Sequence, residues 1–246
     1  MFDSTANKLA LRRPAVDVKR LEDGGLGQLW PFLAAKPPLI VNALNWHTGG
    51  GCCFGLDLAL VTGGTLYVAE GGRGGLMEML SEIPPSIYVD SALGLEAMVE
   101  PLETDEGLRR VMLKNLDLMV CVGPPLKPQL KQRLDEACLS EFGRRVNLAS
   151  FWGPGESLGG GFWLSEDQEE EGNIGLPLPA SQVKLMAAGE RLEICLKGPN
   201  LAPACLRDGI FQNLELDEDG FLPTGFAGRL ADPLRPFKGM VLDGPI

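Results

Sequence analysis

The sequence predicts an α/β fold with a largely parallel sheet layered with helices, followed by a smaller β-rich, distorted barrel-like subdomain. Between Leu39 and Trp152, apolar runs of strand length alternate with segments whose apolar residues have helical spacing. After Gly161, short β-type runs are divided by proline and glycine, and few helical patterns remain. The 246 residues, of which 45% are hydrophobic, are enough to bury a large core.

Three segments are expected along the chain. Residues 1–28 mix charges with weak apolar spacing and contain Arg13-Pro14, which predicts a loosely attached lead-in. Residues 29–171 form the predicted α/β subdomain, and residues 172–246 form the β-rich subdomain. No internal repeat or low-complexity tract interrupts them.

The elements of the α/β subdomain follow from the alternation in order. A short helix at Gly27–Leu33 ends at Lys36-Pro37-Pro38, because proline cannot continue a helix. The other predicted strands lie at Leu39–Leu44, Thr65–Ala69, Ser86–Val89, Leu116–Val122 and Val146–Trp152, and the other helices at Phe54–Val61, Leu76–Ser81, Leu93–Leu102, Gly107–Leu113 and about Leu126–Cys138. Two further strands, Val183–Met186 and Leu192–Leu196, are expected in the β-rich part.

The glycine-rich segments do not match the common nucleotide-binding motifs. Residues Gly71 to Gly75 lack the spacing of a dinucleotide fingerprint, which favours a flexible loop there. No phosphate loop of the Gly-x-x-x-x-Gly-Lys-Ser/Thr type is found. The sequence therefore offers no standard phosphate cradle.

The charge of the chain limits its partners. A formal net charge of -11 and a pI near 4.7 argue against nucleic acid or an acidic membrane surface, since either needs clustered Lys and Arg. No apolar run approaches the roughly 20 residues of a membrane helix, and the N-terminus has no continuous signal-peptide core. A cytoplasmic protein without a membrane or nucleic-acid partner is expected.

The six cysteines show no Cys-x-x-Cys spacing, and His47 is the one histidine, so a mixed Cys/His zinc site is not predicted. Cys121, Cys138 and Cys195 lie among apolar neighbours and are expected to be structural. Cys52 and Cys53 lie in a glycine-rich turn beside His47, where a reactive thiol is the alternative.

The turn from Asn147 to Gly161 is the most informative stretch. It follows a predicted strand, contains several glycines, and presents the carboxylate of Glu156 just beyond the strand end. Gly155-Glu156-Ser157-Leu158-Gly159 also matches the nucleophile elbow of α/β-hydrolases, with Ser157 as nucleophile. Against that alternative, His47 precedes the serine instead of following it, and three glycines occupy the start of the required helix.

A second interpretation comes from a series of short motifs that occur in order. The motifs are Asn45-Trp46-His47-Thr48-Gly49, Gly63-Gly64-Thr65-Leu66-Tyr67-Val68, Pro84-Pro85-Ser86-Ile87-Tyr88, Gly123-Pro124-Pro125-Leu126, Trp152-Gly153-Pro154-Gly155-Glu156, Gly172-Asn173-Ile174-Gly175-Leu176-Pro177-Leu178-Pro179, Lys197-Gly198-Pro199 and Gly220-Phe221-Leu222-Pro223-Thr224-Gly225. In this order the chain resembles the acyl-adenylate-forming (AMP-binding) synthetases from about Trp30 to Gly244, most closely the feruloyl-CoA synthetases. The resemblance implies a fragment of the large domain of that family.

The resemblance also implies a reaction and a set of site residues. Family members convert a carboxylic acid and ATP to an acyl-adenylate, which a thiol such as coenzyme A captures. By resemblance, Glu156 is the carboxylate linked to Mg²⁺, His47 belongs to the segment by the acyl pocket, and Trp152 stacks on adenine. The residues also allow structural roles, with Trp152 in the core and with Glu156 and His47 hydrogen-bonded within their turns. The expected nucleotide-binding residues are Gly123, Pro124, Pro125, Trp152, Gly153 and Gly155.

Several departures from the family pattern weaken the catalytic prediction. Gly155 replaces the motif threonine, Phe226 replaces the aspartate that binds the ribose, and Pro245 replaces the hinge arginine. The Lys-ending phosphate loop expected upstream of Trp30 and the C-terminal lid domain with its lysine are not found. Each departure affects a different part of one mechanism, which favours a chain that is inactive alone.

Two functions therefore remain open from the sequence. One is an acyl-CoA synthetase-like enzyme that acts on a small carboxylic acid once a completing chain supplies the missing parts. A homodimer could instead cover the truncated edge of the α/β layer. The other is a non-catalytic interaction or binding module that keeps the fold.

Overall fold

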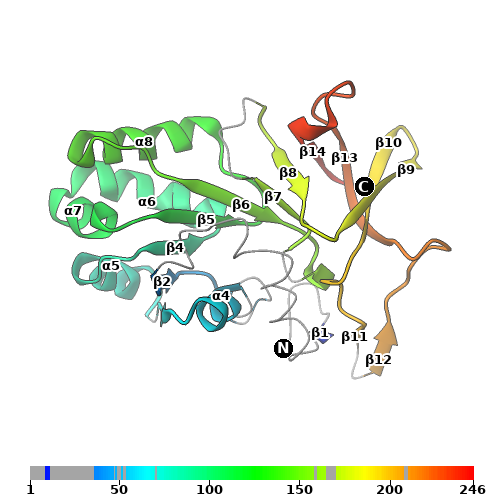
Figure 1. The fold of residues 1–246 in the computed structure, drawn as a ribbon, viewed down its shortest axis with the longest axis horizontal. Coiled ribbons are helices and arrows are strands. Elements are labelled where there is room, and N and C mark those ends of the chain that lie inside the picture. Colours follow the sequence, from blue (N-terminus) through cyan, green and yellow to red (C-terminus); the bar gives the residue numbers. More distant parts are fainter. Residues whose placement is uncertain are drawn as a thin grey trace.

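The described part of the chain is built around one long sheet (Figure 1). The computed structural model describes residues 9–11, 36–46, 48, 51, 54–69, 71–157, 160–164, 170–207 and 210–246. The predicted helix at Gly27–Leu33 and most of the predicted lead-in lie outside these residues. Within them, eleven strands pair in the order β3-β2-β4-β5-β6-β7-β8-β14-β13-β10-β9.

The first five strands in this order are parallel, which confirms the predicted α/β class. Their bounds are β2 Leu39–Asn42, β3 Thr65–Val68, β4 Ile87–Asp90, β5 Leu118–Val122 and β6 Leu148–Trp152. β4 is buried along its whole length. Near-continuous apolar runs such as this are typical of parallel strands that are covered on both faces.

Helices cover both faces of this parallel part (Figure 1). The helices are α4 Gly55–Thr62, α5 Gly72–Glu82, α6 Ala92–Thr104, α7 Glu106–Lys114 and α8 Pro128–Phe142. Helices α5 to α8 pack on one face, in a core that includes Tyr88 and Met119. Helix α4 packs on the opposite face, against Ile40 and Ile87.

The predicted loop from Gly71 to Gly75 is wrong, because helix α5 begins at Gly72. Glycine is a poor helix former, which is why this turn was not predicted as helix. The buried side chains of Leu76 and Leu80 hold the helix against the sheet. Packing of this apolar face outweighs the low intrinsic helix propensity of its first turn.

The β-rich part continues the same sheet with antiparallel pairs. Its strands are β7 Phe162–Leu164, β8 Asn173–Pro177, β9 Gln182–Ala188, β10 Arg191–Lys197, β13 Leu222–Leu230 and β14 Met240–Pro245. A separate three-stranded sheet has the order β1 (Leu9–Leu11), β11 (Ala204–Arg207), β12 (Ile210–Asn213). The division at residues 171 and 172 stays a prediction, since pairing of β7 with β8 carries the long sheet across it.

No helix in the described ranges is long and apolar enough to cross a membrane.

Candidate functional site

The structure brings two of the predicted nucleotide-binding segments together. Gly123 to Pro125 follow β5, and Trp152 to Gly155 end and follow β6, which is the parallel neighbour of β5. The backbone N–H of Gly123 donates to the carbonyl oxygen of Phe151 at 2.8 Å. Both segments therefore lie at the carboxyl edge of the parallel strands, where α/β proteins commonly bind ligands.

Glu156 lies in a 3₁₀ turn, Gly155–Ser157, immediately beyond β6. Its carbonyl oxygen accepts a hydrogen bond from the N–H of Ala202 at 2.8 Å, which ties the turn to the segment between β10 and β11. Among the described residues, no three His, Cys, Asp or Glu side chains are grouped closely enough to hold a metal ion. Mg²⁺ commonly binds only one or two protein carboxylates besides phosphates and water, and the magnesium role of Glu156 stays a prediction.

Trp152 is enclosed by aromatic side chains from two other strands. The ring of Phe162 on β7 lies 5.7 Å from the Trp152 ring, centroid to centroid, and tilted by 51°. The ring of Phe226 on β13 lies 5.4 Å away and nearly perpendicular, at 87°. Only 4% of Trp152 is exposed. A planar base would need an open indole face for stacking, and this burial leaves none.

The hydroxyl group of Ser157 is used inside its own turn. Ser157 is 3% exposed, and its Oγ donates to the carbonyl oxygen of Pro154 at 2.8 Å. A nucleophilic serine needs a hydroxyl that is open to substrate and hydrogen-bonded to a base. The geometry therefore gives the hydrolase alternative no support, and His47 lies outside the described residues, as do Cys52 and Cys53.

Two buried polar side chains at the same edge of the sheet were not singled out from the sequence. Asp90, at the end of β4, accepts hydrogen bonds from the Tyr88 hydroxyl and the Ser91 N–H, both at 2.7 Å. Burial raises the pKa of the Asp90 carboxyl above its usual range, and burial together with the neighbouring Asp90 raises the pKa of Tyr88. Ser150 is buried in the middle of β6. A polar residue within an otherwise apolar strand was the available signal for both.

The thiols behave as predicted from their apolar neighbours. Cys121, Cys138 and Cys195 are buried and form no disulfide, and Cys205 is buried as well. Burial raises the pKa of Cys121 to about 12, and its thiol donates to the carbonyl oxygen of Pro124 at 3.4 Å. A thiol held protonated in this way is a poor nucleophile.

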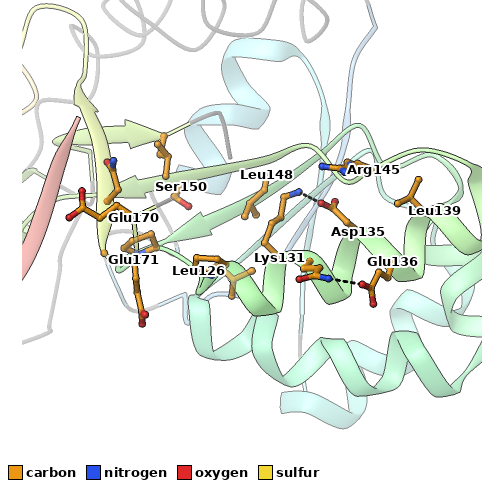
Figure 2. A pocket seen from close by; sticks show the side chains of 16 residues that line it. Leu126, Lys131, Asp135, Glu136, Leu139, Arg145, Leu148, Ser150, Glu170 and Glu171 are labelled. Atoms are coloured by element: carbon orange, nitrogen blue, oxygen red, sulfur yellow. Dashed lines mark hydrogen bonds and ion pairs between the residues drawn. The ribbon is translucent and has the colours of Figure 1, made fainter. Parts of the chain in front are cut away.

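A cavity of about 440 Å³ lies between helix α8 and strands β6, β7 and β8 (Figure 2). Of the predicted nucleotide-binding residues, Pro125 lines it. Lys131 Nζ lies 2.6 Å from Asp135 Oδ2, and Asp135 Oδ1 accepts from the N–H of Val146 at 3.0 Å. The Lys131 and Asp135 pair has the i,i+4 helical spacing that a sequence can reveal, although it had not been predicted.

Comparison with known proteins identifies the family. The model of the AMP-binding enzyme family matches residues 36–204. The chain belongs to this family. It is 34% identical to long-chain-fatty-acid–CoA ligase 6 of Rattus norvegicus over 86 residues, a match that covers 32% of this chain and 12% of that ligase.

Solved structures support the same fold. E. coli MenE, bound to an analogue of OSB-AMS, superposes with a TM-score of 0.70 at 15% identity, and the match covers 100% of this chain and 47% of MenE. The O-succinylbenzoate coenzyme A synthetase of Bacillus subtilis, in complex with AMP, gives a TM-score of 0.66 at 18% identity. That match covers 100% of this chain and 60% of the synthetase. The chain thus spans about half the length of these proteins, and a still smaller part of the curated ligases.

Proposed function

We propose that this chain keeps the nucleotide-facing edge of an acyl-CoA ligase fold but does not form an acyl-adenylate by itself. The observation that carries the proposal is the packing of Phe226 against Trp152 at 5.4 Å. By resemblance, these are the positions of the ribose-binding aspartate and the adenine-stacking aromatic residue. An apolar ring here supplies no acceptor for the ribose hydroxyls and helps to bury the indole.

The missing carboxylate has a large expected effect on affinity. Two hydrogen bonds from ribose hydroxyls to a carboxylate contribute about 1.5–3 kcal/mol each. Their loss corresponds to roughly a hundredfold to ten-thousandfold weaker nucleotide binding. Gly155 also lacks the hydroxyl that the family threonine directs at the phosphate. Binding of ATP or AMP in the family manner is therefore proposed to be weak, and the chain is proposed to serve as a binding or interaction module.

A second candidate is acyl-CoA ligase activity completed by another chain. The turn beyond β6 supports it, because Glu156 in that turn is, by resemblance, the carboxylate that the family links to Mg²⁺. The co-substrates would be ATP with Mg²⁺ and coenzyme A. We propose an aromatic acid of the feruloyl type from the motif resemblance, while the curated relatives are named for long-chain fatty acids.

Calorimetric titration of the full chain distinguishes these candidates. Mg-ATP and a non-hydrolysable feruloyl-adenylate analogue are titrated into the wild-type chain and into Glu156→Ala. The proposal expects no heat of specific binding for either ligand at micromolar concentrations. Micromolar binding of the analogue that is lost in Glu156→Ala would overturn it and favour the completed enzyme.

A further inference from the structure

The turn between β13 and β14 presents two large apolar side chains to solvent. Leu234 is 92% exposed and Phe237 is 68% exposed, and both lie between Asp232 and Gly239. Single exposed apolar residues are common on protein surfaces. Two of them three residues apart on one turn form a compact apolar tip, which is a more specific feature.

Hydrogen bonds within the turn hold this tip in one conformation. Asp232 Oδ1 accepts from the N–H of Leu234 at 2.9 Å, and Asp232 Oδ2 pairs with Arg235 Nε at 2.5 Å. The N–H of Lys238 donates to the carbonyl oxygen of Arg235 at 2.9 Å. An ordered segment loses less conformational entropy on association than a flexible one. The turn is therefore pre-organised for contact with a partner.

The cavity beside α8 is chemically complementary to this tip. Its apolar lining includes Leu126, Leu139, Leu148 and Leu164 (Figure 2). Four carboxylates line it, Asp135, Glu136, Glu170 and Glu171, together with the cationic groups of Lys131 and Arg145. Asp135 pairs with Lys131 and Glu170 pairs with Arg229, both at 2.6 Å, so Glu136 and Glu171 supply the acidic excess. On the tip, Arg235 pairs with Asp232, and Lys238 supplies one further positive charge. Complementary charge of this kind favours recognition and fixes the register of two surfaces.

The tip and the cavity border each other on the same molecule. Asn173 lines the cavity, and its Nδ2 donates to the carbonyl oxygen of Lys238 at 2.9 Å. In Figure 1 the turn lies beside β8, at the top of the view. Because the tip and the cavity lie side by side, the tip of one copy can meet the cavity of a second copy while the reverse contact forms at the same time. A two-fold symmetric dimer requires a surface that is self-complementary in this way.

We propose that two copies of this chain associate through this face, with Leu234 and Phe237 of each copy entering the cavity of the other. Apolar anchors in a pocket supply most of the affinity in such interfaces. Glu136 and Glu171 at the cavity then face Lys238 of the second copy. This surface differs from the truncated sheet edge at which a dimer was expected from the sequence.

Sedimentation velocity over a range of concentrations tests the proposal. The wild-type chain is expected to dimerise in the micromolar range, and the double variant Leu234→Asp, Phe237→Asp to raise the dissociation constant at least about a hundredfold. The matched control Leu93→Asp changes a residue that is 77% exposed on α6 and is expected to leave dimerisation intact. Circular dichroism verifies that every variant is folded.

Cross-linking tests the pairing of the two surfaces. Phe237→Cys and Leu139→Cys are made in differently tagged chains, mixed, and treated with a short bismaleimide. A covalent dimer carrying both tags is expected, above the background of the two tagged wild-type chains. A monomeric wild-type chain, a double variant that still dimerises, dissociation by Leu93→Asp, or no mixed-tag dimer would each overturn the proposal. A monomer that co-sediments with phosphatidylcholine vesicles would assign the tip to a lipid surface instead.

Discussion

Replacing Phe226 by aspartate should open the nucleotide site that the aromatic packing closes. The change removes the perpendicular ring at 5.4 Å from Trp152 and places a carboxylate where, by resemblance, the family binds ribose. Phe226 is half-buried, so loss of its contacts is expected to lower the free energy of unfolding by about 1–3 kcal/mol. Two new hydrogen bonds at about 1.5–3 kcal/mol each should strengthen binding of an adenylate analogue roughly a hundredfold to ten-thousandfold.

Calorimetry with the feruloyl-adenylate analogue measures this gain, and thermal unfolding measures the stability cost. Phe226→Ala is the control, because it removes the ring without adding acceptors and should gain far less affinity. A folded Phe226→Asp variant that binds no better than the wild-type chain would refute the argument that Phe226 closes the site. Equal gains in Phe226→Ala and Phe226→Asp would show that the carboxylate contributes nothing.

Three further predictions concern stability. Asp135→Ala removes the carboxylate that pairs with the mostly buried Lys131 and accepts from the N–H of Val146, and should cost about 2–4 kcal/mol in urea unfolding. Arg133→Ala at an exposed ion pair should cost about 0–1 kcal/mol, and equal costs would contradict this. Burial raises the pKa of Asp90 in the folded chain, so the protonated carboxyl group stabilises the fold. This stabilisation is fully present below about pH 4, the ordinary pKa of aspartate in the unfolded chain, and is lost as the pH rises through the raised pKa of the folded chain. The free energy of unfolding of Asp90→Asn should therefore rise relative to that of the wild-type chain as the pH increases. A difference in free energy of unfolding that stays constant between pH 4 and 8 would refute this. Gly175→Ala should destabilise the pairing of β7 and β8 and lower the melting temperature, because φ is +82° there and a Cβ would overlap the carbonyl oxygen of Trp163; an unchanged melting temperature would refute it.

The parallel half of the fold was predictable because its signals are local. Strands such as β4 and β5 are short and mostly apolar runs, and α8 repeats an apolar residue every fourth position. Strands β13 and β14 gave weaker signals, since glycines and prolines interrupt both. Their place in the sheet depends on pairing with distant strands, which a local pattern does not encode.

In the candidate site, too, only the feature with a local sequence signal was predicted. The turn that presents Glu156 was found because glycines follow an apolar strand. A core position for Trp152 was one of two interpretations of the sequence, but its contacts were not predicted, since they depend on Phe162 from a three-residue strand and Phe226 from β13. The substitution at position 226 was visible in the sequence, but its contact with the indole is a property of the sheet register.

We propose that this member of the AMP-binding enzyme family does not adenylate an acid by itself. The test is acid-dependent exchange of labelled pyrophosphate into ATP, measured with the purified wild-type chain, Mg²⁺ and a panel containing ferulate, benzoate and a long-chain fatty acid. For every acid, we expect exchange no faster than in the protein-free blank. Acid-dependent exchange that is abolished by Glu156→Ala would overturn the proposal.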